Sequence, residues 1–342
     1  MSVFSDKTFV FPKAHQQASP AETMPTLLIT GGAGFIGAHT AKMAIENGWK
    51  VRILDNLSTG LQAKAEMLQR LGADVIIGDV RDASTVHSAV AGCQAVVHLA
   101  AQVSVPQSVE FPQETLEINV GGTENLLNSC NINGVSRFVL ASSAAVYGTN
   151  DAFPLDESDA GAFHSPYADS KWQNEQQVLK AKEAGMEAVA LRFFNVYGTG
   201  QRADGAYAAV IPKFIELAVG GLAPTIFGDG LQTRDFVHVD DVAQALLLLA
   251  TEPWTDEFEH VYNVCTQTEI SLLDLLSSIH NILADVSPET PRPSPNHAEE
   301  RAGDIARSVG SKERLVNDSS WTPKIEFAQG LRQQILDSIE DA

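Results

Sequence analysis

Short apolar segments alternate with longer amphipathic ones through the first two thirds of the chain. From residue 26 the order is an apolar run, TLLIT, a glycine-rich turn, GGAGFIG, an amphipathic stretch, AHTAKMAIENG, and a second apolar run, KVRILD. Further apolar runs follow at ADVIIGD, AVVHLA, RFVLASS and AVALRFF. Continuous apolar runs of this length indicate strands buried on both faces, and the segments between them indicate covering helices. The pattern predicts an α/β fold with a doubly wound parallel sheet of the Rossmann type.

Two longer amphipathic stretches, at about 111–132 and 166–184, are expected to be helices that cover this sheet. The longest apolar run, around ALLLLA at 245–250, is too short to cross a bilayer and predicts a buried helix. After residue 195 the sequence becomes rich in glycine, proline and mixed loops, which predicts a smaller α/β region that is interleaved with the first. We expect a poorly ordered extension (1–24), a Rossmann domain (25–194, to which the chain returns at about 235–263) and a substrate-binding region (195–234 and 264–342).

The composition narrows the partners that the chain can bind. Its 342 residues include 43 acidic and 23 basic side chains, a net charge of −20, which argues against nucleic acid because phosphates require a basic surface. Small anionic ligands are still allowed, since a few arginines and helix amides can hold them. Cys93, Cys130 and Cys265 form no CxxC motif and no metal-ligand cluster, so we expect reduced thiols and no metal. A cytoplasmic protein without a signal peptide or membrane segment is expected.

Three glycines, Gly31, Gly34 and Gly37, lie directly after the first predicted strand and open a helix. This context suits a dinucleotide, because glycine permits a tight turn and lets helix amides approach a pyrophosphate. Asp55 closes the next strand eighteen residues after Gly37, where a carboxylate can accept from ribose hydroxyls and repel a 2'-phosphate, which favours NAD over NADP. A structural turn with a capping aspartate is the alternative. Asp79, in GDVRD, either accepts from the adenine amine or is a turn residue at a strand end.

Tyr167 and Lys171 are four residues apart in a predicted helix, so they share one face. A free phenol titrates near pH ~10, and its use as a base at neutral pH requires a nearby cation. Lys171 and a positively charged cofactor ring are the expected cations. A pair on a solvated helix surface is the alternative interpretation.

Eight motifs occur in the order that is typical of extended short-chain dehydrogenase/reductases: TGGAGFIG, LDNLSTG, GDVRD, HLAAQ, NVGGT, SSAAVYG, SPYADSK and RFFNVYG. From about residue 26 to 335 the chain resembles nucleotide-sugar 4-epimerases. The resemblance implies that Tyr167 is the catalytic base, that Lys171 lowers the pKa of this base and binds the nicotinamide ribose, and that Ser143 hydrogen-bonds the reacting oxygen. Asn119 corresponds to a structural asparagine of the family. The remaining implied NAD contacts are Phe35, Ile36, Asn56, Ser58, Gly60, Val80, Leu99, Ala100, Ala101 and Asn119.

Two alanines distinguish reactions within this family. Dehydratases carry an Asp-Glu pair after the serine or threonine, and related decarboxylases keep the Glu, whereas this chain has Ala144 and Ala145. A methyl group transfers no proton, so the resemblance favours epimerisation over elimination, unless a carboxylate arrives from elsewhere in the chain.

The resemblance also implies residues that bind a UDP-sugar. Arg234 and Arg301 correspond to the two diphosphate-binding arginines, Asp304 to the uridine ribose ligand, Asn195 to a diphosphate contact and Phe227 to part of the uracil slot. Guanidinium groups suit that anion. Further substrate contacts are implied at Ser104, Ser143, Tyr167, Ala209, Val210, Lys213, Thr225 and Ser308.

Ser308, seven residues after Arg301, is the position that lines the sugar pocket in the family, where a bulky aromatic admits only unsubstituted hexoses. A small residue leaves room for an N-acetyl group, and GAYAAVIPKF and SVPQS resemble the subgroup that acts on UDP-N-acetylhexosamines. Gln107 and Val103 depart from the pattern, because that subgroup often has Arg at 107 and galactose epimerases have Lys at 103. We expect a homodimeric NAD-dependent UDP-GlcNAc/UDP-GalNAc 4-epimerase of polysaccharide biosynthesis. The alternatives are UDP-glucuronate or UDP-glucose as substrate, a net dehydrogenase or reductase, and a catalytically silent NAD-binding protein.

Overall fold

The computed structural model describes residues 24–161, 163–203, 209–254, 258–300 and 305–340. Its centre is a seven-stranded sheet with the order β11-β6-β5-β4-β1-β2-β3, and every pair within it is parallel. The predicted doubly wound sheet is therefore confirmed. The strands are β1 (Thr26–Thr30), β2 (Lys50–Asp55), β3 (Asp74–Ile77), β4 (Ala95–His98), β5 (Arg137–Ser143), β6 (Glu187–Phe193) and β11 (Val261–Val264).

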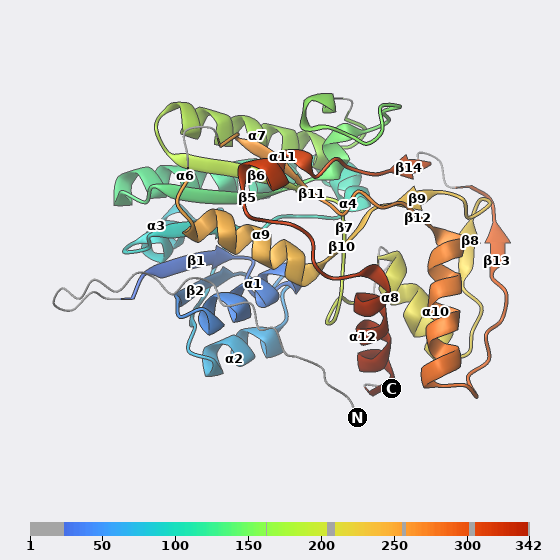
Figure 1. Cartoon of the computed structure of the whole chain (residues 1–342). Helices are drawn as coiled ribbons and strands as arrows, with labels where there is room; N and C mark the ends of the chain where they lie inside the picture. Colours follow the sequence, from blue (N-terminus) through green and yellow to red (C-terminus); the bar gives the residue numbers. More distant parts are fainter. Residues whose placement is uncertain (1–23, 162, 204–208, 255–257, 301–304, 341–342) are drawn as a thin grey trace.

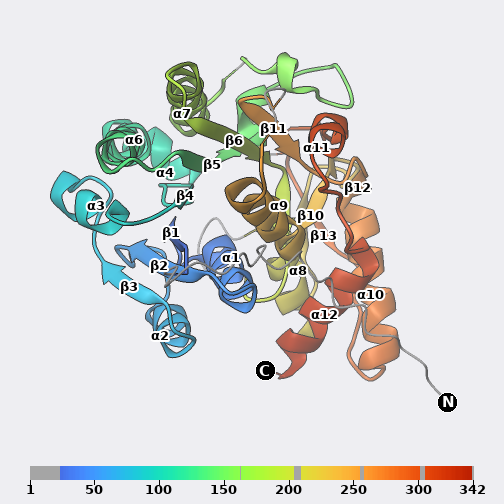
Figure 2. The same cartoon turned by 60° about the vertical axis from the view of Figure 1, so that its left-hand side comes forward.

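Helices cover both faces of this sheet because alternate strand residues point to opposite sides. Leu27, Ile29 and Ile53 belong to the core on one face, and Leu28 and Leu54 belong to the core on the other. Figure 2 shows α1, α2 and α9 on one side of the sheet and α3, α6 and α7 on the other. These helices are α1 (Phe35–Glu46), α2 (Gln62–Arg70), α9 (Val239–Thr251), α3 (Ala83–Val90), α6 (Gly122–Asn133) and α7 (Pro166–Glu183).

The apolar run at 245–250 lies in α9, and all six of its residues are buried in the core that α9 shares with α1. The prediction of a buried helix is thus confirmed. The two predicted amphipathic helices also exist, although the first comprises α5 (Pro112–Leu116), the π-helical turn η1 (Glu117–Gly121) and α6. No helix in the described part of the chain has the length and apolar character needed to cross a membrane.

A second region of shorter elements stands beside the sheet (Figure 1). Helices α8 (Val210–Val219), α10 (Leu272–Val286) and α12 (Phe327–Glu340) share a core that includes Ile226 and Phe236. Three small sheets complete it: β7 (Asn195–Tyr197) with β10 (Phe236–His238), β8 (Thr225–Phe227) with β13 (Asn296–Ala298), and β12 (Ile270–Ser271) with β9 (Thr233–Arg234) and β14 (Arg307–Ser308).

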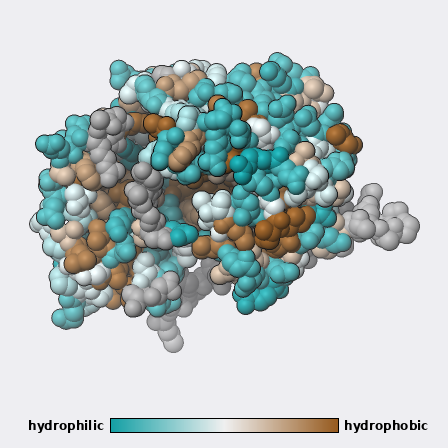
Figure 3. All heavy atoms as spheres, turned by 180° about the vertical axis from the view of Figure 1, so that it is seen from behind, coloured by the Kyte–Doolittle hydropathy of each residue, from teal (hydrophilic) through white to brown (hydrophobic). Residues whose placement is uncertain are grey.

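The chain crosses between the two regions more than once. It leaves the sheet after β6, returns through β10, α9 and β11, and leaves again into β12 and α10. On the face opposite to the view of Figure 1, the surface is hollowed near its middle, between these regions (Figure 3). We propose the division given above, with boundaries at 194/195, 234/235 and 263/264. The extension expected at 1–24 lies, except for Met24, outside the described residues.

Candidate active site

A cavity of about 590 Å³ lies across the carboxyl ends of the central strands. Ligands bind at this edge of open parallel sheets, where the strand order reverses; here the reversal lies between β1 and β4. The lining follows the strand order: Gly78, Val80 and Arg81 after β3; Asp55, Asn56, Ser58 and Thr59 at β2; Gly31, Gly34, Phe35, Ile36 and Gly37 after β1; Leu99 to Ser104 after β4; Ala141, Ser142 and Ser143 in β5; and Phe193, Phe194 and Val196 at β6 and β7. The helical residues Tyr167 and Lys171 close one end.

The glycine turn after β1 leaves no room for side chains. Gly31 has a left-handed φ of +69°, and a Cβ at this position would lie 2.8 Å from the backbone nitrogen of Ala100. A Cβ on Gly37 would lie 2.2 Å from the carbonyl oxygen of Gly31. The bare backbone before α1 therefore opens directly into the cavity, which is what a dinucleotide pyrophosphate requires. The residues present fit NAD.

Asp55 fixes this turn as well as lining the cavity. Its buried carboxylate accepts hydrogen bonds from the backbone nitrogen of Ala33, at 2.9 Å, and from that of Leu57, at 2.8 Å. A Cβ on Gly60 would lie 2.7 Å from Asp55 Oδ1, so Gly60 allows the loop to close over the carboxylate without lining the cavity. Asp55 thus connects the loops that follow β1 and β2.

Asp79 is not among the residues that line the cavity, whereas its neighbour Arg81 is. The Arg81 guanidinium donates to both Asp79 oxygens, at 2.9 and 2.7 Å, and Asn56 Nδ2 donates at 3.0 Å. The hydrogen bond from Arg81 holds the pKa of Asp79 well below its usual range. The carboxylate therefore stays charged and engaged with the protein.

Tyr167, Ser143 and Lys171 converge at the other end of the cavity, as expected. Tyr167 is in the first turn of α7, which begins with Pro166 and is capped by the Ser165 hydroxyl. Ser143 ends β5, and its hydroxyl accepts from the nitrogen of Ala145 at 3.2 Å. Burial raises the pKa of Tyr167, and a hydrogen bond with Ser143 opposes this shift.

Lys171 lies one turn further along α7, with its side chain buried. Its ammonium donates to the carbonyl oxygen of Ala141 at 2.8 Å and is 6.0 Å from the centre of the Tyr167 ring. Burial lowers the pKa of Lys171 to about 8, and the Glu175 carboxylate opposes this shift. In the protein alone Lys171 thus loses its charge before the phenol ionises. The expected lowering of the pKa of Tyr167 requires a further cation.

Asn119 occupies the π-helical turn η1 and is buried behind the site. Its amide donates to the Gln102 carbonyl at 3.0 Å and to the Ser170 hydroxyl at 2.9 Å, and its Oδ1 accepts from the Gln102 nitrogen at 2.8 Å. Single π turns often occur at functional sites. Asn119 joins the loop after β4 to α7 and does not line the cavity, so its position fits the implied structural role but not the implied contact with NAD.

A buried ion pair links α7 to strand β6 of the central sheet. Arg192, in β6, donates to both oxygens of Glu175 at 2.9 and 2.8 Å, and their side chains are 2% and 1% exposed. The Ser142 hydroxyl donates to Glu175, while Arg192 also donates to the Tyr147 hydroxyl at 2.9 Å. Glu175 therefore connects α7, the end of β5 and β6.

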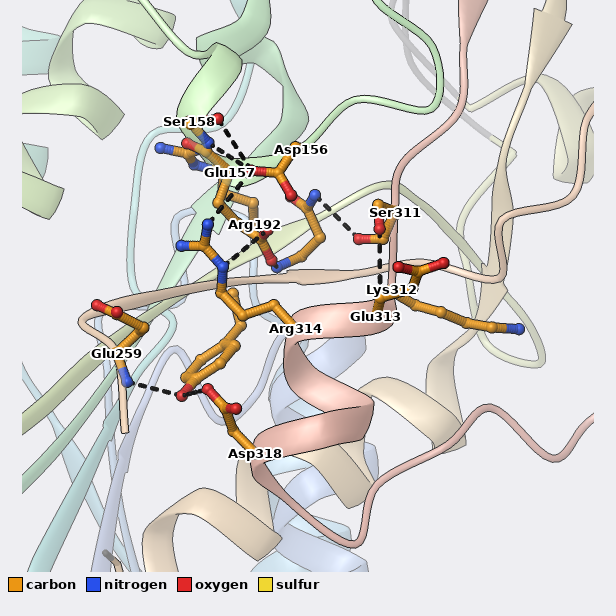
Figure 4. A network of polar contacts seen from close by, with 12 residues as sticks. Asp156, Glu157, Ser158, Arg192, Glu259, Ser311, Lys312, Glu313, Arg314 and Asp318 are labelled. Atoms are coloured by element: carbon orange, nitrogen blue, oxygen red, sulfur yellow. Dashed lines mark hydrogen bonds and ion pairs between the residues drawn. The ribbon is translucent and has the colours of Figure 1, made fainter. Parts of the chain in front are cut away.

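The same network reaches the C-terminal segment. Arg192 donates to the backbone carbonyl of Glu157 at 2.8 Å. Arg314, from α11 (Glu313–Asp318), lies 3.2 Å from the carboxylates of both Asp156 and Glu157 (Figure 4). The Ser311 nitrogen donates to the Leu155 carbonyl at 2.8 Å. These contacts hold the segment that follows β14 against the sheet region.

The residues expected to bind the sugar nucleotide occupy the second region. Ser308 and Arg234 are register partners in β14 and β9, so they lie side by side. Arg234 donates to the backbone carbonyls of Thr233 and Ile305, and Lys213 pairs with Glu216 at 2.5 Å. Thr225 and Phe227 are in β8, Asn195 begins β7, and Ala209 and Val210 begin α8. Ser104 caps α4 (Val105–Glu110) and lines the cavity. Arg301 and Asp304 lie outside the described residues.

Sequence reasoning missed several cavity residues. Gln201 reaches the wall from the loop after β7, and its Nε2 donates to the Val196 carbonyl at 3.0 Å. Gln102 and Ile118 come from the segments on either side of α4 and α5. Arg81 follows directly after the GDV of a recognised motif, so its position was the one signal that could have identified it.

The fold and the site together define a dinucleotide-dependent enzyme with a tyrosine, a lysine and a serine at one end of its cavity. The model of the NAD dependent epimerase/dehydratase family matches residues 27–265, and the chain belongs to this family. It is NAD-dependent, as the glycine turn and Asp55 predicted.

Three similar proteins locate the chain within the family. A putative UDP-glucose 4-epimerase of Methanocaldococcus jannaschii is 35% identical, covering 90% of this chain and 97% of the relative. The UDP-N-acetylglucosamine 4-epimerase of Methanobrevibacter ruminantium, solved with UDP-N-acetylmuramic acid, is 33% identical with a TM-score of 0.84 over 94% of this chain and 100% of that one. The UDP-glucose 4-epimerase of Thermotoga maritima, solved with UDP-glucose, is 30% identical with a TM-score of 0.85 over 92% and 99%. The expected family is confirmed.

Proposed function

We propose that the protein interconverts the C4 epimers of a UDP-hexose, with UDP-GlcNAc and UDP-GalNAc as its substrates. The arrangement of Ser143, Tyr167 and Lys171 at one end of the NAD cavity carries this proposal. The similar proteins named above include 4-epimerases for UDP-glucose and for UDP-N-acetylglucosamine, which supports the reaction and leaves both sugars as candidates.

In this proposal the Tyr167 phenolate takes the proton of the C4 hydroxyl, and Ser143 donates a hydrogen bond to the same oxygen. NAD, when bound, accepts a hydride from C4 and returns it. After the 4-keto sugar turns its other face, Tyr167 gives the proton back to the C4 oxygen. The Lys171 ammonium stabilises the phenolate and binds the nicotinamide ribose, and the burial of both side chains excludes water that would weaken these charges.

Elimination requires an additional acid and base, which the described residues around Tyr167 and Ser143 do not supply. Ala144 and Ala145 follow Ser143 directly. Among the described residues that line the cavity, the carboxylates are Asp55 and Glu114; Asp55 lies at the end of β2, and Glu114 is near Arg81. Both are at the end away from Tyr167. This distribution favours epimerisation over dehydration or decarboxylation, and the presence of Tyr167, Lys171 and Ser143 argues against a silent NAD-binding protein.

The preference for an N-acetylated sugar rests on Ser308. In β14 its small side chain lies beside Arg234, one of the proposed diphosphate ligands. We therefore expect Ser308→Tyr to lower turnover of UDP-GlcNAc by about 10- to 100-fold, because a ring would occupy the space of the acetamido group. Turnover of UDP-glucose should change little, and this substrate is the internal control.

The measurement follows the anomeric proton signals of each sugar nucleotide during incubation with the purified protein. UDP-GlcNAc, UDP-glucose and UDP-glucuronate are compared separately. Conversion of UDP-glucuronate or UDP-glucose without conversion of UDP-GlcNAc would establish the corresponding alternative. Stoichiometric appearance of NADH would instead indicate a net dehydrogenase.

The titration of Tyr167 is expected to depend on the cofactor. In the protein without NAD⁺, burial raises the pKa of this phenol, and Lys171, with a pKa of about 8, is already neutral where the phenol ionises. A cationic nicotinamide ring favours the charged phenolate, so NAD⁺ should move the ionisation to lower pH, whereas NADH, whose ring is neutral, should not. The difference in absorbance near 295 nm between the unaltered protein and Tyr167→Phe reports this phenolate. Identical titrations with and without NAD⁺ would refute the proposed stabilisation.

We also infer a homodimer formed through α6 and α7. These two helices line a groove of about 960 Å³ on the outer surface, and Ile132, which follows the groove residue Asn131 in α6 but does not line the groove itself, is 70% exposed. Light scattering should give twice the chain mass of 36.7 kDa, and Ile132→Asp should lower it because the charge would be buried at the interface. A monomeric mass for the unaltered protein would contradict the inference.

A further inference from the structure

The backbone N–H of Tyr167 finds its acceptor in another helix. The first nitrogens of an α-helix have no partner within that helix. At the start of α7, Pro166 carries no N–H, and the Ser165 hydroxyl accepts from the Ala168 nitrogen at 3.2 Å. Tyr167, which stands between them, donates to the hydroxyl of Ser108 at 3.1 Å. Ser108 belongs to α4, so the first turn of α7 is tied at Tyr167 to an element 59 residues earlier in the chain.

The Ser108 hydroxyl can act only as an acceptor toward Tyr167. A serine hydroxyl has one proton and two lone pairs. Ser108 donates its proton to the Val105 carbonyl at 2.6 Å, and its backbone nitrogen donates to the Ser104 carbonyl at 2.9 Å. The residue is fully buried, so water does not compete for the hydroxyl. Ser108 is therefore fixed within α4, and a lone pair of its oxygen is left for the Tyr167 N–H.

A second hydroxyl holds the carbonyl of Tyr167. Ser170 Oγ donates to this carbonyl at 2.7 Å, and the Asn119 amide donates to Ser170 Oγ at 2.9 Å. Ser108, Ser170 and Asn119 are all buried, and none of them is among the described residues that line the cavity. They can therefore affect the reaction only through the residues that they hold, and both backbone groups of Tyr167 are held.

Helix α4 also forms part of the cavity wall. Ser104, its N-cap, and Gln107 both line the cavity, and the Gln107 nitrogen donates to the Ser104 hydroxyl at 3.3 Å. Ser108 follows Gln107 directly. One helix of six residues thus supplies both a part of the wall and the acceptor that holds Tyr167. A ligand that rests against α4 and the phenol of Tyr167 have this helix as their common support.

We propose that Ser108 is a positioning residue for the reaction and fixes the Tyr167 phenol relative to a sugar that rests against α4. Reacting groups must lie within a narrow range of distances, and a displacement of about 1 Å can lower a rate by about 10²-fold. The inference rests on the proposed role of Tyr167 as the base and is independent of which sugar is the substrate. The alternative is a contact that contributes only to stability.

Ser108→Ala removes the acceptor and leaves the Tyr167 N–H buried without a partner. We expect kcat for epimerisation to fall by about 10- to 100-fold, because the first turn of α7 is no longer held against α4. KM and the amount of NAD that the purified variant retains should be nearly unchanged, since Ser108 does not line the cavity. Ser108→Cys, which offers a weaker acceptor in a similar volume, should have an intermediate kcat.

Thr115→Val is the matched control. Thr115 of α5 is also buried, and its hydroxyl donates to the Phe111 carbonyl at 3.0 Å, as the Ser108 hydroxyl does to Val105. Within the described part of the chain, however, the Thr115 hydroxyl accepts no hydrogen bond from α7. The midpoint of unfolding in urea should fall somewhat in both variants, whereas kcat should fall only in Ser108→Ala. A similar loss of kcat in Thr115→Val would indicate a general effect of packing and overturn the proposal.

The ionisation of Tyr167 provides a readout that does not depend on turnover. It is measured with NAD⁺ bound, as the phenolate absorbance of each chain minus that of the same chain with Tyr167→Phe. In Ser108→Ala the phenolate should form at a higher pH than in the unaltered protein, because the phenol is displaced from Ser143 and from the cationic nicotinamide ring. Thr115→Val should titrate as the unaltered protein does.

The outcomes separate this proposal from the proposed function. Normal kcat and a normal titration in Ser108→Ala, beside a slow Tyr167→Phe enzyme, would overturn the positioning role alone. A Ser108→Ala variant that loses only stability would assign Ser108 a structural role and would also overturn it. If the unaltered protein epimerises none of the sugar nucleotides, the proposed function fails, and phenolate formation at a higher pH in Ser108→Ala would still support the positioning role.

Discussion

Replacing Tyr167 by phenylalanine is expected to lower kcat for C4 epimerisation by about 10²–10⁴-fold, the usual contribution of a positioned general acid and base. The variant loses only the hydroxyl that hydrogen-bonds Ser143, while the ring and its packing in α7 stay in place. NAD should therefore still bind with similar affinity. The measurement is the initial rate of epimer formation at saturating UDP-sugar, together with the amount of nucleotide that the purified variant retains.

Tyr262→Phe is the matched control for this substitution. Its hydroxyl is also hydrogen-bonded, to Asp318 at 2.8 Å, and the residue is fully buried, but it does not line the cavity. This variant should lose some stability and keep its kcat. A Tyr167→Phe enzyme that retains NAD and turns over at the normal rate would exclude Tyr167 as the base.

Breaking the ion pair behind the site is expected to have the largest effect on stability. Glu175→Ala leaves the Arg192 guanidinium, 2% exposed, without its carboxylate partner. An uncompensated buried charge costs roughly 3–5 kcal/mol, whereas loss of an exposed pair costs about 0–1 kcal/mol. The unfolding midpoint in urea should therefore fall sharply.

Two further variants distinguish the cost of an unpaired buried charge from other effects of the substitution. Removing both charges, with Glu175→Leu and Arg192→Met together, should recover part of the lost stability because no unpaired charge remains. Lys42→Ala, which breaks an exposed pair with Glu46 at 3.9 Å, should leave the midpoint nearly unchanged. Equal midpoints for Glu175→Ala and the unaltered chain would show that Arg192 finds another partner.

The sheet could be predicted because its residues repeat a local pattern. Runs such as TLLIT and RFVLASS place apolar side chains on both faces, and the buried strands β1 and β5 have this property. The run at 245–250 became α9 for the same reason, since a continuous apolar segment has no solvent-facing side. The π-helical turn that holds Asn119 has no comparable signal, because it differs from an α-helix only in which backbone groups pair.

The site residues that belong to recognisable sequence motifs could be predicted, and those outside the motifs could not. The glycine turn, Asp55, Ser143, Tyr167 and Lys171 line one cavity because they follow strand ends or begin helices at one edge of the sheet. The engagement of Asp79 with Arg81 was not predicted, and neither was the connection from Arg192 through Glu175 to Ser142. Such contacts depend on side-chain orientation in three dimensions. The pKa directions of Tyr167 and Lys171 also follow from burial, which spacing alone does not specify.

The proposed mechanism requires that C4 gives a hydride to NAD and then takes the same hydride back. Tyr167 moves only the proton of the C4 hydroxyl. Incubation of the purified protein with UDP-GlcNAc deuterated at C4 tests it most directly, with the product examined by mass spectrometry and proton NMR. We predict UDP-GalNAc that retains the deuterium at C4, with no net NADH. Loss of deuterium to water, or the absence of a C4 epimer, would contradict the account.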